Sequence, residues 1–174
     1  MYSYKERSFI PNESFMKLAI AHAEAAALQD EIPVGAVVVR EGRILGIGQN
    51  RRESSRDALM HAEMEAIKAA CSTLRDWRLQ DCELYVTLEP CPMCMGAVLN
   101  ARIQRVIFGA DDFNAGCCGS ALSFEGLQAY RQPEIFPGFM EQECRQLLSA
   151  FFCRIRGTAS HAKAVGHSTT AREF

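Results

Sequence analysis

The chain has 174 residues, 48% of them apolar, and a formal net charge of −2. This length suffices for one well-packed core but is short for two ordinary domains, so we expect a single domain. The balanced charge excludes a globally basic nucleic-acid-binding protein, and any basic surface must be local. No segment approaches the roughly 18 apolar residues of a membrane span, and the start "MYSYKERSFI" does not resemble a signal peptide. We therefore expect a cytoplasmic protein with no membrane partner.

The first part of the chain changes from a helical pattern to a strand pattern. Asn12 is a suitable N-cap for a helix that continues to about Leu28, because apolar residues recur there every three to four positions. Two β-rich runs then flank the turn signal Glu41-Gly42. The pattern predicts a β-hairpin over residues 34–49.

After the hairpin, helical and strand patterns alternate. The expected order is a polar loop at 50–57, a helix at 61–74, a strand at 83–89, a helix at 92–101, a strand at 103–110, a stretch rich in Gly and Pro at 110–138 and a terminal helix at 140–156. Such alternation favours an α/β fold, with helices on both faces of one sheet. We expect the domain to span residues 1–156 and the last residues, 157–174, to form a flexible tail.

The stretch "TLEPCPMCMGA" delivers two cysteines to the start of a helix. Pro92 suits the first helical position, so Cys91 and Cys94 share one face near the helix N-terminus, which lowers thiol pKa values. With the imidazole of His61, two thiolates form a ligand set suited to zinc. Three protein ligands leave a fourth tetrahedral position for water, and zinc lowers the pKa of that water towards ~7.

An acid two residues after the histidine has a natural place in this chemistry. Glu63 in "MHAEMEAI" would lie in the first turn of its helix, beside the water on the metal. From there the carboxylate can shuttle protons without ligating the zinc.

The cysteines also allow two other interpretations. Cys91 and Cys94 also fit a thioredoxin-like dithiol redox pair, because a Cys-x-x-Cys at a helix N-terminus is typical of that chemistry. Structural zinc would instead require a fourth ligand, from Cys71, Cys82 or Cys117. The eight cysteines do not indicate a disulfide framework, since such frameworks are typical of short secreted chains, and we expect most of the thiols to be reduced and buried.

The motifs together resemble a known family. His-x-Glu followed by Pro-Cys-x-x-Cys is the signature of zinc-dependent nucleobase deaminases. The stretches "EIPVGAVVV", "MHAEMEAI", "WRLQDCELYVTLEPCPMCMGA", "ARIQRVIFGA" and "ECRQLLSAFF" are similar, in this order, to bacterial tRNA-specific adenosine deaminases. This resemblance covers about residues 13–156.

The resemblance implies a fold, a cofactor and a set of site residues. The fold would be a three-layer α/β/α sandwich of the cytidine-deaminase type with a mixed five-stranded sheet, usually in a homodimer. One Zn²⁺ per chain would be held by His61, Cys91 and Cys94, with Glu63 as the catalytic proton shuttle. The implied substrate contacts are Asn50 with the nucleoside, Val34 along the base, the backbone N–H of Ala62 at the base edge and Asp112 in the loop around the flipped nucleotide.

The expected function is hydrolytic deamination of adenosine to inosine at the wobble position of a tRNA anticodon loop, with a zinc-activated water. A deaminase of a free base or nucleoside such as guanine is the alternative. The near-neutral charge favours it, as does the loop "GADDFNAGCCGS", where Asp111 and Asn114 stand at positions that are often basic in the family and Cys117-Cys118 at positions usually small. A dithiol redox protein or an RNA-binding protein without deaminase activity is the second alternative.

Local basic and aromatic residues would carry RNA contacts. Two adjacent aromatics on an amphipathic helix, Phe151 and Phe152, are typical of core residues but could also stack on bases. The candidate phosphate contacts are Arg51, Arg52, Arg56, Arg154 and Arg156.

Overall fold

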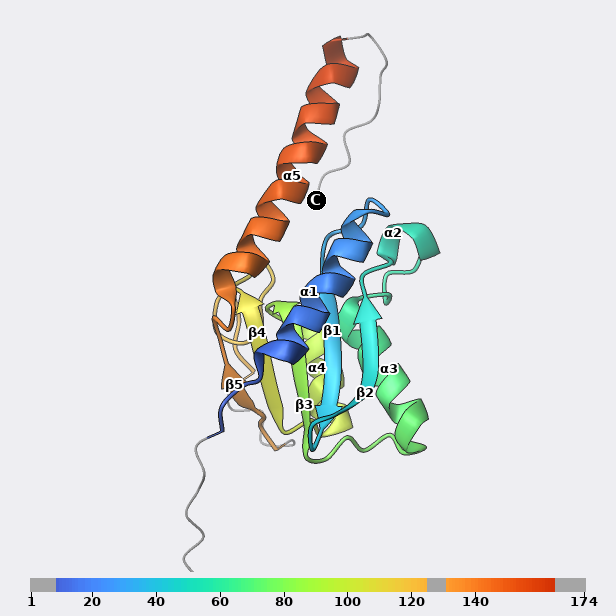
Figure 1. Ribbon diagram of the computed structural model, residues 1–174, viewed down its shortest axis with the longest axis vertical. Helices are drawn as coiled ribbons and strands as arrows, with labels where there is room; N and C mark the ends of the chain where they lie inside the picture. The colour runs from blue at the N-terminus through green and yellow to red at the C-terminus, as the bar shows by residue number, and fades with distance from the viewer. Residues whose placement is uncertain (1–8, 125–130, 165–174) are drawn as a thin grey trace, which may run out of the picture.

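The computed structural model describes residues 9–124 and 131–164, which form one mixed sheet between helices (Figure 1). The sheet order is β2-β1-β3-β4-β5. Its strands are β1 (Gly35–Arg40), β2 (Arg43–Gln49), β3 (Cys82–Leu88), β4 (Arg105–Ala110) and β5 (Glu134–Phe136). β1 runs antiparallel to β2 and β3, whereas β3, β4 and β5 are mutually parallel. The mixed five-stranded sheet is therefore confirmed.

Two helical layers cover the sheet. The helices are α1 (Glu13–Ala27), α2 (Arg52–Ser55), α3 (Ala62–Leu74), α4 (Pro92–Ala101) and α5 (Glu141–Ala164). Alternate residues of β3 point to opposite faces, so that Leu84 and Val86 join the core under α3 and α4, whereas Tyr85 joins the core under α1 and α5. This division into two cores confirms the three-layer α/β/α sandwich.

The predicted hairpin and first helix are also confirmed. Asn12 caps α1, and its Oδ1 accepts a hydrogen bond from the backbone N–H of Ser14 at 2.9 Å. Glu41 and Gly42 connect β1 to β2 with φ angles of 50° and 75°. Positive φ at both central positions is the conformation that suits the right-handed twist of a two-residue hairpin.

Glycines on β2 allow α3 to lie directly against the sheet. A Cβ on Gly46 would collide with the backbone of Ala66, and a Cβ on Gly48 would collide with the backbone of Ala62. The missing side chains let the first turn of α3 approach the end of β2. His61, the N-cap of α3, is thereby placed at the end of the sheet where β1 begins and where β2 and β3 end, and the candidate site lies there.

Three elements differ from the sequence expectation. The four-residue helix α2 forms within the predicted polar loop, and β5 forms within the stretch rich in Gly and Pro. Helix α5 runs on to Ala164, whereas the sequence predicted its end at residue 156. No proline interrupts the chain before that point, and several good helix formers follow residue 156. The last ten residues of the expected tail, 165–174, lie outside the described residues.

None of the helices in the described ranges combines the length and the apolar character that a membrane span requires.

Candidate active site

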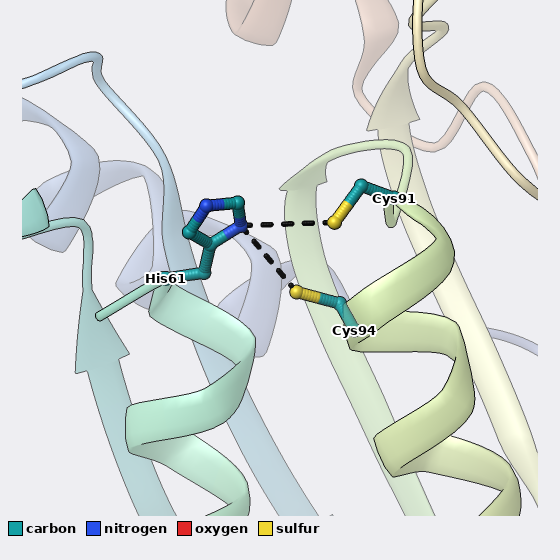
Figure 2. A group of neighbouring side chains, drawn as sticks. All are labelled: His61, Cys91 and Cys94. Atoms are coloured by element: carbon teal, nitrogen blue, oxygen red, sulfur yellow. Dashed lines mark hydrogen bonds between the residues drawn. The ribbon is translucent and has the colours of Figure 1, made fainter. Parts of the chain in front are cut away.

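Two helix N-termini bring a histidine and two cysteines together (Figure 2). His61 is the N-cap of α3, Cys91 is the N-cap of α4, and Pro92 occupies the first helical position of α4 as the sequence predicted. The Nδ1 atom of His61 lies 3.8 Å from Sγ of Cys91 and 3.5 Å from Sγ of Cys94. Within the described ranges, this trio is the cluster whose ligand atoms all lie within 4.8 Å of one another.

These separations fit a tetrahedral zinc site. With Zn–N near 2.0 Å and Zn–S near 2.3 Å, tetrahedral geometry requires ligand N and S atoms to be about 3.5 Å apart. The two N–S separations, 3.5 and 3.8 Å, lie at that value and slightly above it. The cluster does not include Cys71, Cys82 or Cys117, the residues considered as a fourth ligand. The donor set is therefore that of an open zinc site with one position for a water or substrate.

The contact between the two cysteines shifts their pKa values in opposite directions and favours the thiolate form of Cys91. Hydrogen bonding from Cys94 and then from His61 lowers the pKa of the Cys91 thiol to about 4, against the opposing effect of burial. The same contact with Cys91 raises the pKa of Cys94. All eight cysteines of the chain are free thiols, and four of them are buried: Cys82, Cys94, Cys117 and Cys144.

Glu63 lies in the same pocket as His61 and Cys91. It is the second residue of α3, and only 4% of its surface is exposed. Burial raises the pKa of the Glu63 carboxyl, with its own backbone N–H and His61 acting in the opposite direction. A raised pKa brings the carboxyl closer to the pH at which the protein works, which favours its use as a proton shuttle.

The pocket has a volume of about 200 Å³. This is below the range of roughly 300–1,000 Å³ typical of drug-sized ligands, so it fits one planar base better than a whole nucleotide. Cys94 is fully buried beneath the pocket wall. The other seven predicted site residues line the pocket: Val34, Asn50, His61, Ala62, Glu63, Cys91 and Asp112.

Glu89 was missed by the sequence analysis, although it lines the pocket. It is 2% exposed and accepts hydrogen bonds from the backbone N–H groups of Asp112 (3.1 Å), Cys118 (2.7 Å) and Ser120 (3.2 Å). Burial alone would raise the pKa of Glu89, but hydrogen bonds from Ser120 and the other donors hold it below its ordinary value. Because Gly116 has no side chain, its loop can approach this carboxylate closely. Glu89 therefore fixes the loop that carries Asp112.

A second buried carboxylate, Glu31, was also missed. It contacts the side chain of Asn50 and the start of α2. The available signal was an acid directly next to an apolar run: Glu31 precedes such a run in "EIPVG", and Glu89 follows one in "VTLEPC". Acids are rarely buried unless they are paired, so such a position indicates a carboxylate with dedicated partners.

The candidate RNA-contacting arginines differ in their position relative to the pocket. Arg154 donates to the carbonyl of Ala27 at 2.7 Å and pairs with Asp30 at 3.1 Å, so it joins α5 to the end of α1. Arg156 donates to the carbonyl of Phe152 at 3.3 Å. Arg52 pairs with Glu53 at 3.9 Å and lines the pocket. The structure thus favours the loop after β2 over the terminal helix as the basic part of the site.

The two adjacent phenylalanines of α5 have different environments. Phe151 is a core residue with 4% exposure, whereas Phe152 is 38% exposed. The core interpretation therefore holds for Phe151.

Comparison with known proteins identifies the family. Residues 10–110 match the family model for the cytidine and deoxycytidylate deaminase zinc-binding region. The chain belongs to this deaminase family. The matched residues include the His, Glu and two Cys residues of the candidate site, which agrees with zinc as the cofactor.

Individual relatives give a narrower picture. A tRNA-specific adenosine deaminase of Bacillus subtilis (strain 168) is 44% identical over 146 residues, which cover 83% of this chain and 91% of the relative. A solved structure from work on A-to-I editing by tRNA:A34 deaminases at the wobble position matches with a TM-score of 0.76 and 38% identity, over 79% of this chain and all of that chain. A guanine deaminase from Bacillus subtilis matches with a TM-score of 0.56 and 32% identity, over 68% of this chain and 87% of that chain.

Proposed function

We propose that this protein catalyses the hydrolytic deamination of adenosine to inosine at the wobble position of a tRNA anticodon loop. The observation that carries the proposal is the base-sized pocket lined by His61, Cys91 and the buried carboxyl of Glu63, with Cys94 completing the cluster of metal ligands. The similarity to tRNA-specific adenosine deaminases supports tRNA as the substrate.

In this proposal His61, Cys91 and Cys94 hold the zinc ion. When bound, zinc supplies the Lewis acidity that makes a water molecule nucleophilic near neutral pH. Glu63 accepts one proton from the water that attacks C6 of adenine and passes it to N1 of the base. It then accepts the proton of the hydroxyl group formed at C6 and passes that proton to the departing ammonia. Its burial beside the pocket keeps competing water away from the carboxyl and supports this exchange.

The remaining pocket residues orient the base. Ala62 opens α3, so its backbone N–H lies outside the hydrogen-bond ladder of the helix and can donate to the base edge. Val34 gives the pocket an apolar wall, and Asn50 offers an amide to the nucleoside. Asp112 lines the same pocket, on a loop that Glu89 holds in place.

An anticodon loop suits such a pocket. Its bases are already single-stranded, so extruding one base costs less than the few kcal/mol required to open a duplex. We further propose that the protein acts as a homodimer in the cytoplasm, as the family resemblance implies. Light scattering coupled to size-exclusion chromatography measures the oligomeric state directly.

Ammonia release tests the proposal. Zinc-loaded protein is incubated with an anticodon stem-loop that has adenosine at the wobble position, with the same stem-loop carrying guanosine there, and with free guanine. Release from the adenosine stem-loop alone is expected. The Glu63→Ala variant serves as the control, since it removes the proton shuttle without touching a proposed metal ligand.

Guanine deamination is the second candidate function. The observation that favours it is the structural match to a guanine deaminase at 32% identity. In addition, Asp112 lines the pocket and is adjacent in sequence to Asp111, and two neighbouring acids make phosphate binding by this loop less favourable. Efficient release of ammonia from free guanine, with both stem-loops inert, would support this function and reject the tRNA proposal.

A further inference from the structure

Glu31 is a fully buried carboxylate that no part of the proposed chemistry uses. It lies in the loop between α1 and β1. Its backbone N–H donates a hydrogen bond to the carbonyl of Ala26, near the end of α1, at 3.1 Å. An ionised carboxylate is expensive to bury, so its partners indicate what it does.

All the hydrogen-bond partners of this carboxylate that the structure describes belong to the segment after β2. Oε2 accepts from Nδ2 of Asn50 at 3.3 Å and from the backbone N–H of Glu53 at 3.1 Å. Oε1 accepts from the backbone N–H of Ser54 at 2.7 Å. The sheet register explains why Glu31 lies next to this segment. Gly35 pairs with Gln49, so the residues just before Gly35 and those just after Gln49 come together at one end of the sheet.

The contact with α2 is a cap supplied from a distance. Arg51, the N-cap of α2, makes no side-chain capping bond of its own. The first-turn N–H groups of Glu53 and Ser54 are instead satisfied by Glu31. This cap fixes the helix that carries Arg52, one of the residues that line the pocket.

The contact with Asn50 has a sharper consequence. A carboxylate can only accept hydrogen bonds, so it holds the NH₂ end of the Asn50 amide and leaves the carbonyl end facing away from Glu31. Asn50 is 7% exposed and also lines the pocket. The amide orientation that the substrate meets is therefore set by Glu31.

We infer that Glu31 is a positioning residue for deamination: it fixes the orientation of the Asn50 amide and thereby the placement of the target nucleoside. The effect on turnover rests on the proposed function, whereas the contact between Glu31 and Asn50 does not.

The isosteric substitution Glu31→Gln tests the inference. A glutamine keeps the shape but presents one NH₂ group, which meets an N–H donor in either orientation. If its carbonyl keeps the shorter bond to Ser54, its NH₂ faces Asn50 and turns the Asn50 amide around. We expect kcat at saturating RNA to fall about 10- to 100-fold, as misplacement of a substrate does, while zinc content stays unchanged.

A double-mutant cycle separates positioning from a general structural role. In the Asn50→Ala background, Glu31→Gln should change kcat by less than about 2-fold, because the group through which it acts is already gone. Glu65→Gln is the matched control: Glu65 accepts from the backbone N–H of Gln49 at 3.1 Å, beside Asn50 in sequence, and does not line the pocket. Its kcat should remain at the wild-type value. Equal losses from Glu31→Gln in both backgrounds, or no loss in either, would overturn the inference.

A stability measurement keeps the test independent of activity. Asn50→Asp places two carboxylates against each other and should lower the melting temperature, whereas adding Glu31→Gln restores a donor and an acceptor and should raise it again. A further decrease in the double variant would contradict the contact. If the wild-type protein does not deaminate RNA but the double variant regains stability, then the proposed function is rejected and the contact between Glu31 and Asn50 is supported.

Discussion

Replacement of Glu63 by glutamine separates the chemistry of the pocket from its architecture. The glutamine has nearly the same shape, so it should fill the same buried position in the first turn of α3. Glu63 is not in the proposed ligand set, and the His61, Cys91 and Cys94 cluster should retain its zinc. What the variant loses is the exchangeable carboxyl proton.

The size of the loss follows from the number of proton transfers. One general acid or base contributes about 10²- to 10⁴-fold, and Glu63 is proposed to serve the attacking water, N1 of the base and the departing ammonia. We therefore expect kcat to fall by at least about 10⁴-fold, equivalent to about 5 kcal/mol of transition-state stabilisation.

Single-turnover deamination of an anticodon stem-loop measures the chemical step, and metal analysis of the same sample measures zinc. A Glu63→Gln variant that keeps a tenth of the wild-type rate would refute the assignment of Glu63 as the shuttle. Loss of zinc together with activity would instead show that the carboxylate supports the metal site.

Further predictions concern the metal, the loop and the RNA. Cys91→Ser should abolish stoichiometric zinc binding, measured by metal analysis after dialysis; full retention would contradict the ligand set. The pKa of Glu89 is lower in the folded than in the unfolded protein, so its contribution to stability is present above the unfolded pKa and is lost as the pH falls through the folded pKa. Below about pH 4.5, the melting temperature of the wild type should therefore fall more steeply than that of Glu89→Gln. Parallel pH profiles would exclude this role. Arg52→Gln should reduce the salt slope of the logarithm of the RNA binding constant by about 0.7, because Arg52 lines the pocket, whereas Arg154→Gln, whose arginine joins α5 to the end of α1, should leave it unchanged.

The metal cluster could be predicted because each of its parts has a local signature. Cys91 and Cys94 lie at a helix start marked by Pro92, and His61 lies at another helix start, so helix capping alone places all three side chains at element ends. The hairpin turn at Glu41 was equally local. The approach of the two helix starts to each other depends on sheet topology, which the family resemblance supplied.

The buried carboxylates could not be predicted in the same way. Glu31 and Glu89 satisfy backbone N–H groups that lie between 22 and 31 residues further along the chain, so no short sequence pattern contains both the acceptor and its donors. The short helix α2 was missed for the same reason, since its cap comes from Glu31 rather than from a neighbouring side chain. Composition alone would assign both acids to the surface.

Mapping of inosine in a tRNA pool tests the central claim most directly. Zinc-loaded protein is incubated with unmodified tRNAs, and the digested products are read by mass spectrometry, with Glu63→Gln protein as the blank. We expect conversion of adenosine to inosine at the wobble position of tRNAs that carry adenosine there, and no conversion at other adenosines. Unchanged tRNA in the presence of zinc-loaded protein, or conversion at adenosines throughout the molecule, would contradict the proposed function.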